Sequence, residues 1–362
     1  MKNSTYYYYL SDYRLNCDTK KSFLASWQGL SFYAHSMIIP FLPAYFFTAY
    51  CILKKTPKSM NSVKWAILNA HFWCCYTDIL ISSLITPYFY FPAVSGFPVG
   101  LLRFLGVPTT VQAFVGFVSC MFMAISLVAL FENRSSCIPN NIFKITKRRT
   151  KVIYYLINCS VVVCYLIPPL ATIPEQESAR FTLLQTIPCP TEEFFYSEVF
   201  VWAIDKFWCN YLWISTGALV LIIICQILFF SFLCIYYLYI STAVTISLQT
   251  RKNQRSFFLG SITQATLPLV FLEVPVACAI SLIYFEYYNQ DINNSLVILF
   301  SLHGFASSIT IVLVHHPYRR FFIKTITFKK STDEQASSTT SYVTNDFRTK
   351  LRKISSRVVP HS

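Results

Sequence analysis

The chain has 362 residues, of which 54% are hydrophobic and 13% are charged. A soluble domain is about 25% charged because its surface must face water, so this composition excludes an ordinary soluble protein. It also excludes intrinsic disorder, which requires low hydrophobicity. The net charge of +14 would suggest a nucleic-acid partner in a soluble protein. In a membrane protein it reports instead which side faces the cytoplasm.

Long stretches with few charges predict seven membrane-spanning helices. About 20 apolar residues are needed to cross the hydrocarbon core as a helix. Five long stretches contain no Asp, Glu, Lys or Arg, and two more are each interrupted by one acid, Asp78 or Glu273. We therefore predict an all-α membrane protein, a bundle of seven transmembrane helices. The expected helices span residues 25–53, 65–91, 109–132, 152–173, 210–241, 258–285 and 294–316.

The basic residues predict the orientation of these helices. With the N-terminus outside, the inner segments carry 23 of the 30 Lys and Arg residues and a net charge of +19. The outer segments then carry −3 and the spans −2, as the positive-inside rule requires. We expect an extracellular N-terminus (1–24), an amphipathic juxtamembrane segment (317–328) and a disordered cytoplasmic tail (329–362). The protein would then be a multi-pass protein of the plasma membrane, in contact with the lipid bilayer and not with nucleic acid.

Catalytic and metal-binding motifs are missing from the sequence. No Walker loop, GxGxxG, HExxH or CxxC is present. A zinc site needs three or four converging ligands, and the histidine spacing supplies no such set. We therefore expect no enzyme, no metal and no cofactor.

Two acids stand out inside the predicted spans. A charged group at the centre of a bilayer is costly, so Asp78 and Glu273 are expected to face the interior of the bundle. His71 precedes Asp78 by seven residues, about two helical turns, and so shares its face. His303 in the last span could also point inward. These four residues are candidates for a polar network or for ligand contacts; the alternative is a protonated acid that serves packing alone.

The prolines and cysteines give further candidates. Pro268 and Pro275 are expected kink sites in the sixth helix, because proline removes a backbone hydrogen-bond donor. Cys17, Cys189 and Cys209 lie on the predicted outer side, where disulfides can form. The sequence leaves Cys17–Cys189 and Cys189–Cys209 both open and weakly favours the first. Asn3 begins an Asn-Ser-Thr glycosylation sequon on the same side.

Several motifs together resemble one receptor family. The third helix ends Leu130-Phe131-Glu132-Asn133-Arg134, and the seventh ends His315-His316-Pro317-Tyr318-Arg319-Arg320-Phe321. A predicted outer loop carries Ile187-Pro188-Cys189-Pro190, and the sixth helix carries Gln264-Ala265 before its prolines. These segments are similar to the nematode serpentine receptor class H (Srh) family, seven-helix chemoreceptors of the G-protein-coupled type. The resemblance runs from about residue 20 to residue 325.

The resemblance implies a function and a partner. A chemosensory receptor of this type detects a small external molecule, an odorant or pheromone, and activates a heterotrimeric G protein. It implies residence in sensory-neuron cilia and roles in coupling or switching for Glu132, Arg134, Pro317, Tyr318 and Arg319. In rhodopsin-like receptors an acid and an arginine are adjacent at the end of the third helix, whereas Asn133 separates them here. The pocket would be formed by the third, fifth, sixth and seventh helices, whose apolar side chains favour a mainly apolar ligand.

Two other functions are alternatives to a receptor. A channel or transporter is the main alternative, but it needs a polar path, and only Asp78 and Glu273 interrupt the predicted helices, with no basic residue among them. A membrane enzyme is disfavoured because no catalytic cluster is visible. Ligand-gated current without a G protein would favour a channel, whereas ligand-dependent nucleotide exchange would favour a receptor.

Overall fold

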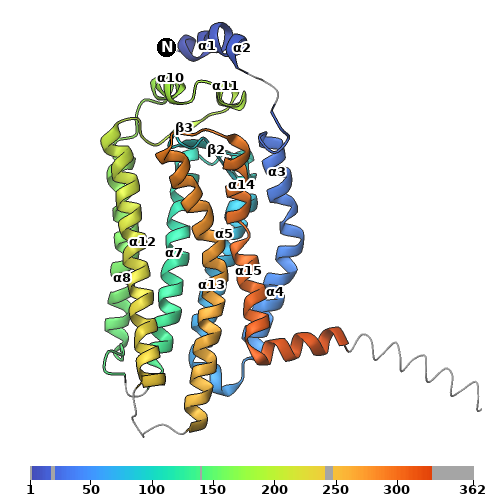
Figure 1. The fold of residues 1–362 in the computed structure, drawn as a ribbon, viewed down its shortest axis with the longest axis vertical. Helices are drawn as coiled ribbons and strands as arrows, with labels where there is room; N and C mark the ends of the chain where they lie inside the picture. Colours follow the sequence, from blue (N-terminus) through green and yellow to red (C-terminus); the bar gives the residue numbers. More distant parts are fainter. Residues whose placement is uncertain (1, 18–20, 139–140, 241–247, 328–362) are drawn as a thin grey trace, which may run out of the picture.

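The structure, a computed structural model, describes residues 2–17, 21–138, 141–240 and 248–327. In this part of the chain seven helical segments run side by side as a bundle (Figure 1). They are α3 and α4 (Trp27–Ser36, Ile38–Lys55); α5 and the turn after it (Asn61–Ile79, Leu80–Leu84); α7 (Thr109–Ser136); α8 and α9 (Arg148–Cys164, Ile167–Ala171); α12 and the turn after it (Lys206–Ile235, Tyr236–Ile240); α13 (Leu248–Tyr284); and α14 and α15 (Gln290–Phe300, His303–Val314). The predicted seven-helix fold is confirmed.

Six of these segments are long and apolar enough to cross a membrane by length and composition. They cover Trp27–Lys55, Thr109–Ser136, Arg148–Ala171, Lys206–Ile240, Thr250–Tyr284 and Gln290–Val314. The segment containing α5 is not one of these six. It carries Lys64, Asn69, His71 and Asp78, and such residues lower its hydropathy. The polar residues of α5 turn out to build much of the bundle's interior network.

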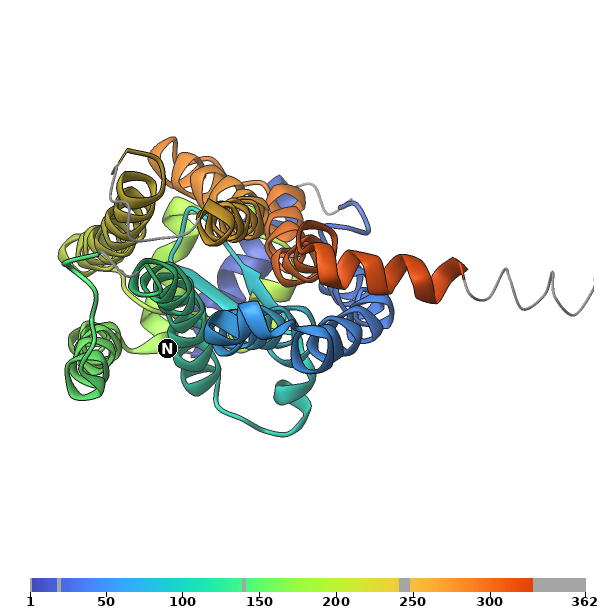
Figure 2. The same cartoon turned by 90° about the horizontal axis from the view of Figure 1, so that it is seen from below.

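Short elements cover one end of the bundle. α1 (Lys2–Tyr8), a helical turn (Tyr9–Tyr13) and α2 (Arg14–Asn16) lie above α10 (Gln176–Thr186) and α11 (Glu193–Tyr196) (Figure 1). We call this end of the bundle the cap end and the opposite end the tail end. At the tail end, a helix of residues 316–327 projects sideways from the bundle, as the view from below also shows (Figure 2).

A small antiparallel sheet lies at the cap end. Its strands are β1 (Pro87–Phe89), β2 (Ser95–Pro98) and β3 (Phe200–Val201), in the order β1-β2-β3. Tyr88 pairs with Phe97, and Gly96 pairs with Phe200. The second helix was predicted to reach residue 91, which is wrong, because the helical segment ends at Leu84. Thr86 has a left-handed φ of 44°, and Pro87 has no backbone donor, so the chain leaves the helix and enters a strand.

Side-chain oxygens cap several helices where they begin. Ser26 accepts a hydrogen bond from the backbone of Gly29 at the start of α3, at 3.0 Å. Asp205 accepts from Phe207 N before α12, and Asn289 accepts from Ile292 N before α14. Such caps satisfy donors that a helix leaves free in its first turn.

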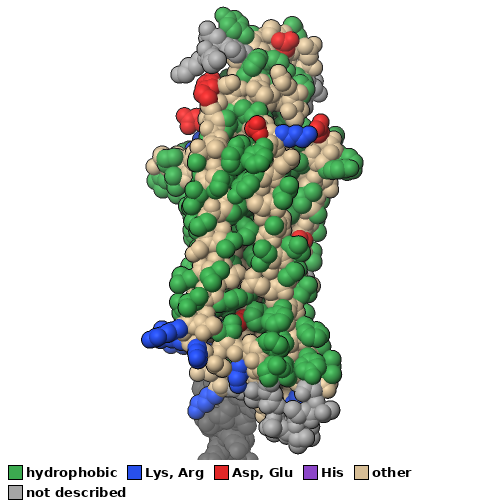
Figure 3. Space-filling model, turned by 90° about the vertical axis from the view of Figure 1, so that its left-hand side faces the viewer, with side chains coloured by type: hydrophobic (Ala, Val, Ile, Leu, Met, Phe, Trp, Pro, Cys, Tyr) green, Lys and Arg blue, Asp and Glu red, His purple; other side chains and the backbone are tan. Residues whose placement is uncertain are grey.

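The core has separate clusters at the two ends of the bundle. At the cap end, Tyr88, Tyr90, Phe97 and Phe194 are buried against the sheet and α10. At the tail end, buried residues of α4, α5, α7 and α15 pack around Tyr318. Between the ends, the face shown in Figure 3 is mostly hydrophobic. Its Asp and Glu side chains lie mostly toward the cap end and its Lys and Arg side chains mostly toward the tail end.

Candidate functional site: a polar network in the bundle and a closed tail end

Asp78 on α5 is the centre of a buried polar network. Its Oδ1 lies 2.7 Å from His303 Nδ1 on α15, and both side chains are fully buried. Its Oδ2 accepts hydrogen bonds from Tyr45 OH on α4 at 2.6 Å and from the backbone N–H of Phe305 at 2.9 Å. Three helices are therefore joined through one carboxyl group, and charge-assisted hydrogen bonds of this kind are the strongest that side chains make.

Gly304 allows α15 to approach Asp78 this closely. A Cβ atom at Gly304 would lie 2.6 Å from Asp78 Oδ2 and 2.6 Å from the carbonyl oxygen of Cys74. Any larger residue would therefore have to push α15 away from α5. The glycine is needed here because it lets two backbones come together.

His71 extends the network toward the tail end. Its Nε2 lies 3.2 Å from the carbonyl oxygen of Tyr45, and its Nδ1 lies 3.5 Å from Cys75 Sγ. Cys75 in turn lies 3.8 Å from Ser308 Oγ. His71 therefore reaches Asp78 through Tyr45 and does not touch it directly. In the described part of the chain, no group of three or more His, Cys, Asp or Glu residues is arranged to hold a metal ion.

Glu273 lies outside this network. Its side chain on α13 is exposed, and it makes no hydrogen bond or ion pair among the described residues. The expectation that it faces the packed interior is therefore wrong. The reason is rotational: α13 turns a different face toward α15 and α7, with Ser261, Gln264 and Ala265 buried. Glu273 remains a candidate only for contact with a ligand or another molecule.

At the tail end, Glu132 and Arg134 of α7 are both buried but have different partners. Glu132 forms an ion pair with Lys151 on α8 at 2.6 Å and accepts a hydrogen bond from Tyr155 OH at 2.8 Å. Arg134 Nε donates to Ser261 Oγ on α13 at 2.7 Å. The acid thus joins α7 to α8, and the arginine joins α7 to α13.

Arg134 is incompletely neutralised in this position. Its guanidinium also lies 5.7 Å from the centre of the Phe257 ring on α13. Its Nη2 is buried and makes no hydrogen bond within the described residues. A buried cation that lacks an acidic partner carries a desolvation cost, which favours any change that gives it one.

The residues after α15 close the same end. Tyr318 is fully buried and its OH lies 2.7 Å from Thr56 Oγ1. His315 Nε2 lies 3.3 Å from Gln264 Oε1 on α13. Pro317 is in the first turn of the helix at 316–327, and Arg319 is exposed, with Nη1 donating to the carbonyl oxygen of Leu313 at 3.1 Å. Tyr318 and His315 are therefore buried in contacts with other helices, whereas Arg319 lies on the surface.

The two proline candidates lie within α13. The helix runs from Leu248 to Tyr284 and continues through both Pro268 and Pro275, and Pro275 is buried. Each proline leaves the carbonyl of the preceding turn without its usual donor. They are therefore positions at which α13 has fewer internal hydrogen bonds than an unbroken helix would have.

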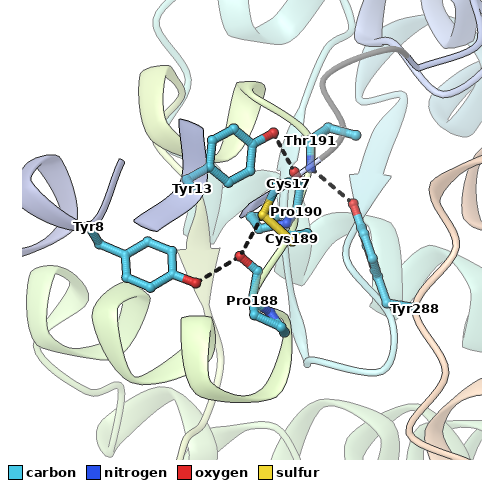
Figure 4. The surroundings of a disulfide bond; sticks show 8 residues. All are labelled: Tyr8, Tyr13, Cys17, Pro188, Cys189, Pro190, Thr191 and Tyr288. Carbon is cyan, nitrogen blue, oxygen red and sulfur yellow. Dashed lines mark hydrogen bonds between the residues drawn. A yellow bond between two sulfur atoms is a disulfide. The ribbon is translucent and has the colours of Figure 1, made fainter. Parts of the chain in front are cut away.

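A disulfide joins the N-terminal segment to the loop after α10. Cys17 is bonded to Cys189, and Cys209 is free (Figure 4). Around the bond, Tyr8 OH donates to the carbonyl oxygen of Pro188 at 2.9 Å, and Tyr13 OH donates to that of Pro190 at 2.8 Å. Tyr196 OH also donates to Tyr9 OH at 2.6 Å, so one covalent bond and three hydrogen bonds hold the N-terminal segment against the cap end.

Burial changes the acidity of Tyr13 in this cap. Its side chain is fully buried, and burial, followed by the nearby charges of Glu192 and Glu193, raises the pKa of Tyr13 to about 12. The phenol is therefore neutral and able to donate its hydrogen bond at physiological pH. Asn3 lies in α1 of the same segment.

Comparison with known proteins agrees with the motif resemblance. Residues 25–328 match the family described as serpentine type 7TM GPCR chemoreceptor Srh. The chain is 36% identical over 322 residues to Serpentine receptor class H-72 of Caenorhabditis elegans. These 322 residues cover 89% of this chain and 92% of that protein. The chain belongs to the serpentine receptor class H chemoreceptor family.

In this class H receptor, the structure brings Asp78 and His303 into contact. His71 is linked to Asp78 through Tyr45, which contacts both residues. The structure separates Glu273 from them, and it separates Glu132 from Arg134. Sequence reasoning missed Tyr45, Ser261 and Lys151 as their partners. Tyr45 and Ser261 are ordinary residues of apolar helices, so nothing in their spacing marked them. Lys151 was counted as one more inner charge, although its position just before an apolar stretch was the available signal.

Proposed function

We propose that this protein is a chemosensory receptor that binds a small external molecule, an odorant or pheromone, and activates a heterotrimeric G protein. The observation that supports this proposal most directly is the hydrogen bond between Arg134 and Ser261, which joins α7 to α13 at the tail end. Release of that contact would expose a buried, incompletely paired guanidinium to a protein bound there. Membership of a family of seven-helix chemoreceptors supports this role.

The proposed orientation places the cap end outside the cell and the tail end in the cytoplasm. The basic residues of the helix at 316–327, with Lys54, Lys55 and Arg148 to Lys151, would then face anionic lipid and the G protein. We propose the plasma membrane, and within it sensory cilia, as the location. The receptor would work without catalysis and without a cofactor.

The Asp78 network is proposed as the switch between the two ends. It joins α4, α5 and α15 halfway along the bundle, and changing any one bond alters how these helices pack. A ligand shifts such an equilibrium only if it binds one state more tightly than the other. His71, Asp78 and His303 would transmit the change, and the prolines of α13 would let that helix move.

Nucleotide exchange tests the proposed function. Membranes carrying the receptor are given a panel of odorants and pheromones, and exchange of GDP for GTP on added G proteins is measured. At least one compound is expected to accelerate exchange, and the Arg134→Ala variant at equal surface expression is expected to lose that response. Ligand-gated current without a G protein, with no exchange for any compound, would favour the alternative of a channel or transporter.

A further inference from the structure

A small polar hollow lies at the cap end, apart from the buried network. Its volume is about 140 Å³, and it is lined by Phe97 and Pro98 of β2, Arg103, the loop at Gly106 to Pro108, the start of α7 and Glu198. A cavity of about 150 Å³ holds one benzene molecule, so this hollow suits a molecule of about six non-hydrogen atoms. None of its residues takes part in the Asp78 network.

One residue that lines the hollow, Gln112, has an acceptor without a donor. Gln112 is 1% exposed, and its Nε2 donates to the carbonyl oxygen of Val107 at 2.8 Å. That bond fixes the amide so that Oε1 is the remaining group, and Oε1 makes no hydrogen bond within the described part of the chain. A buried acceptor left unpaired costs free energy, so a donor at this position would be stabilised.

Opposite charges stand at the rim. Arg103 and Glu198 are both exposed and line the same hollow, yet no ion pair joins them within the described residues. The Arg103 guanidinium lies 5.4 Å from the centre of the Phe97 ring, which holds it over an apolar wall. Each charge is therefore available to a group of opposite sign on a bound molecule.

The start of α7 adds a second preference for negative charge. α7 is 28 residues long, and its N-cap residue, Pro108, supplies no side-chain hydrogen bond to the first turn. The free N–H groups of a helix N-terminus favour an anion. A carboxylate is thus attracted by α7 and Arg103 together, whereas an ammonium group is attracted by Glu198 and by Gln112 Oε1.

We propose that this hollow binds a small zwitterion of the size of an amino acid such as alanine. Its carboxylate would lie toward Arg103 and the start of α7, and its ammonium group toward Glu198 and Gln112. Chemically, the hollow matches such a molecule in size and in the sign of each charge. The inference rests on the proposed function in one respect, namely that the cap end faces outward and the bound molecule is the external signal.

Direct binding tests this proposal without a G protein. Full-length receptor in lipid nanodiscs is titrated by calorimetry with L-alanine, and with ethylamine and propionate, which each lack one of its charges. L-alanine is expected to bind saturably with a Kd of about 1 mM or tighter. Both single-charge analogues are expected to bind at least about tenfold more weakly.

Exposed rim variants assign the binding to this hollow. Arg103→Gln and Glu198→Gln are each expected to weaken L-alanine binding by about tenfold or more. The matched controls Lys206→Gln and Glu177→Gln remove a charge at the cap end outside the hollow and should leave binding unchanged. Both rim residues are exposed, so folding is expected to survive, and thermal unfolding of each variant checks it.

The contrary results are equally definite. No saturable heat up to about 10 mM L-alanine would mean that the hollow holds water alone and would overturn the proposal. Equal binding of L-alanine and ethylamine, or unchanged binding in both rim variants, would overturn it as well. Because no G protein is present, a receptor that binds L-alanine but never promotes exchange would contradict the proposed function and leave this inference standing.

Discussion

Asp78, Glu132 and Arg134 are charged side chains that the described bundle buries. Burying a charge costs several kcal/mol, so each must be compensated by partners. Asp78 has two hydrogen bonds and lies 2.7 Å from His303 Nδ1, and Glu132 has three partners, one of them a lysine. Arg134 has one hydrogen bond, to a neutral hydroxyl, and no acidic partner among the described residues. The least compensated of the three therefore lies at the tail end, where we place the G protein.

Gly304 gives a prediction at the level of one residue. Gly304→Ala is expected to lower the free energy of unfolding by about 1–3 kcal/mol, because its Cβ would overlap Asp78 Oδ2. Gly217→Ala on α12 is the matched control, since no atom lies within 4 Å of a Cβ there. Alanine is the better helix former by about 1 kcal/mol, so this control is expected to be neutral or stabilising. Thermal unfolding in detergent measures both, and an equal Tm for the two variants would contradict the close approach.

Single residues also show how far sequence reasoning reaches. Asp78 and His303 could be singled out because polar groups are rare in apolar helices and tend to face inward. The same rule failed for Glu273, since one acid in an apolar run does not reveal the rotation of its helix. Tyr45 and Ser261 could not be predicted, because their roles depend on which helices are neighbours.

The N-terminal segment is an element held in place by contacts from distant parts of the chain. The disulfide between Cys17 and Cys189 closes a loop across 172 residues of sequence. Tyr8 and Tyr13 add hydrogen bonds to the loop that carries Cys189. The segment is too short to be a stable helix alone in water, so its position depends on these bonds.

Loss of the disulfide should release this segment. Cys17→Ser is expected to weaken docking of the N-terminal segment by about 2–5 kcal/mol. Without the disulfide, no covalent bond keeps the segment near the cap end when its hydrogen bonds open. Hydrogen exchange of residues 2–17 would then become faster. Cys209→Ser is the matched control, since Cys209 is free and should leave exchange unchanged. Equal protection in Cys17→Ser and the unaltered chain would show that the hydrogen bonds suffice.

The pKa of Tyr13 predicts a dependence of docking on pH. It is about 12 in the folded cap and about 10 when the segment is released. The docked segment therefore holds the Tyr13 proton more tightly than the released one. The contribution of Tyr13 to docking is fully present below pH 10 and is lost as pH rises from 10 to 12. The total change is about 3 kcal/mol.

Tyr13→Phe isolates that effect. It removes the titrating hydroxyl and the bond to Pro190, so docking is weaker by about 1 kcal/mol at pH 8 but falls less between pH 10 and 12. Exchange of residues 2–17 measured across this range separates the two variants. Parallel curves would mean that the loss comes from other groups.

Whole elements were predicted unevenly. The seven helices could be read from uncharged stretches, and their observed positions agree to within several residues at most ends. One exception is the second helix, where a left-handed Thr86 and Pro87 begin a strand. The other is the sixth helix, which was predicted to begin at 258, whereas α13 is helical from Leu248. The sheet and the short cap helices were not predicted, because three paired residues give no periodic signal and their pairing joins segments about 100 residues apart.

Across the whole molecule, the two ends have different chemistry. The cap end carries the disulfide, the sheet and the polar hollow, and the tail end carries the basic helix and Arg134. Between them the Asp78 network joins α4, α5 and α15. A signal that begins at one end and is read at the other would pass through these helices, and the contact between α7 and α13 would be its last step.

That last step can be measured without knowing the ligand. Ser261→Ala removes the acceptor of Arg134. Ser281→Ala on the same helix is the control, because Ser281 is exposed and its hydroxyl donates to the carbonyl oxygen of Ala277, one turn earlier in α13. Nucleotide exchange on a G protein is recorded for each variant at equal surface expression without added ligand. We expect Ser261→Ala to raise basal exchange several-fold, up to about tenfold, and Ser281→Ala to match the unaltered receptor. Basal exchange that is the same in all three would contradict the central claim that the contact between Arg134 and Ser261 holds the receptor in its inactive state.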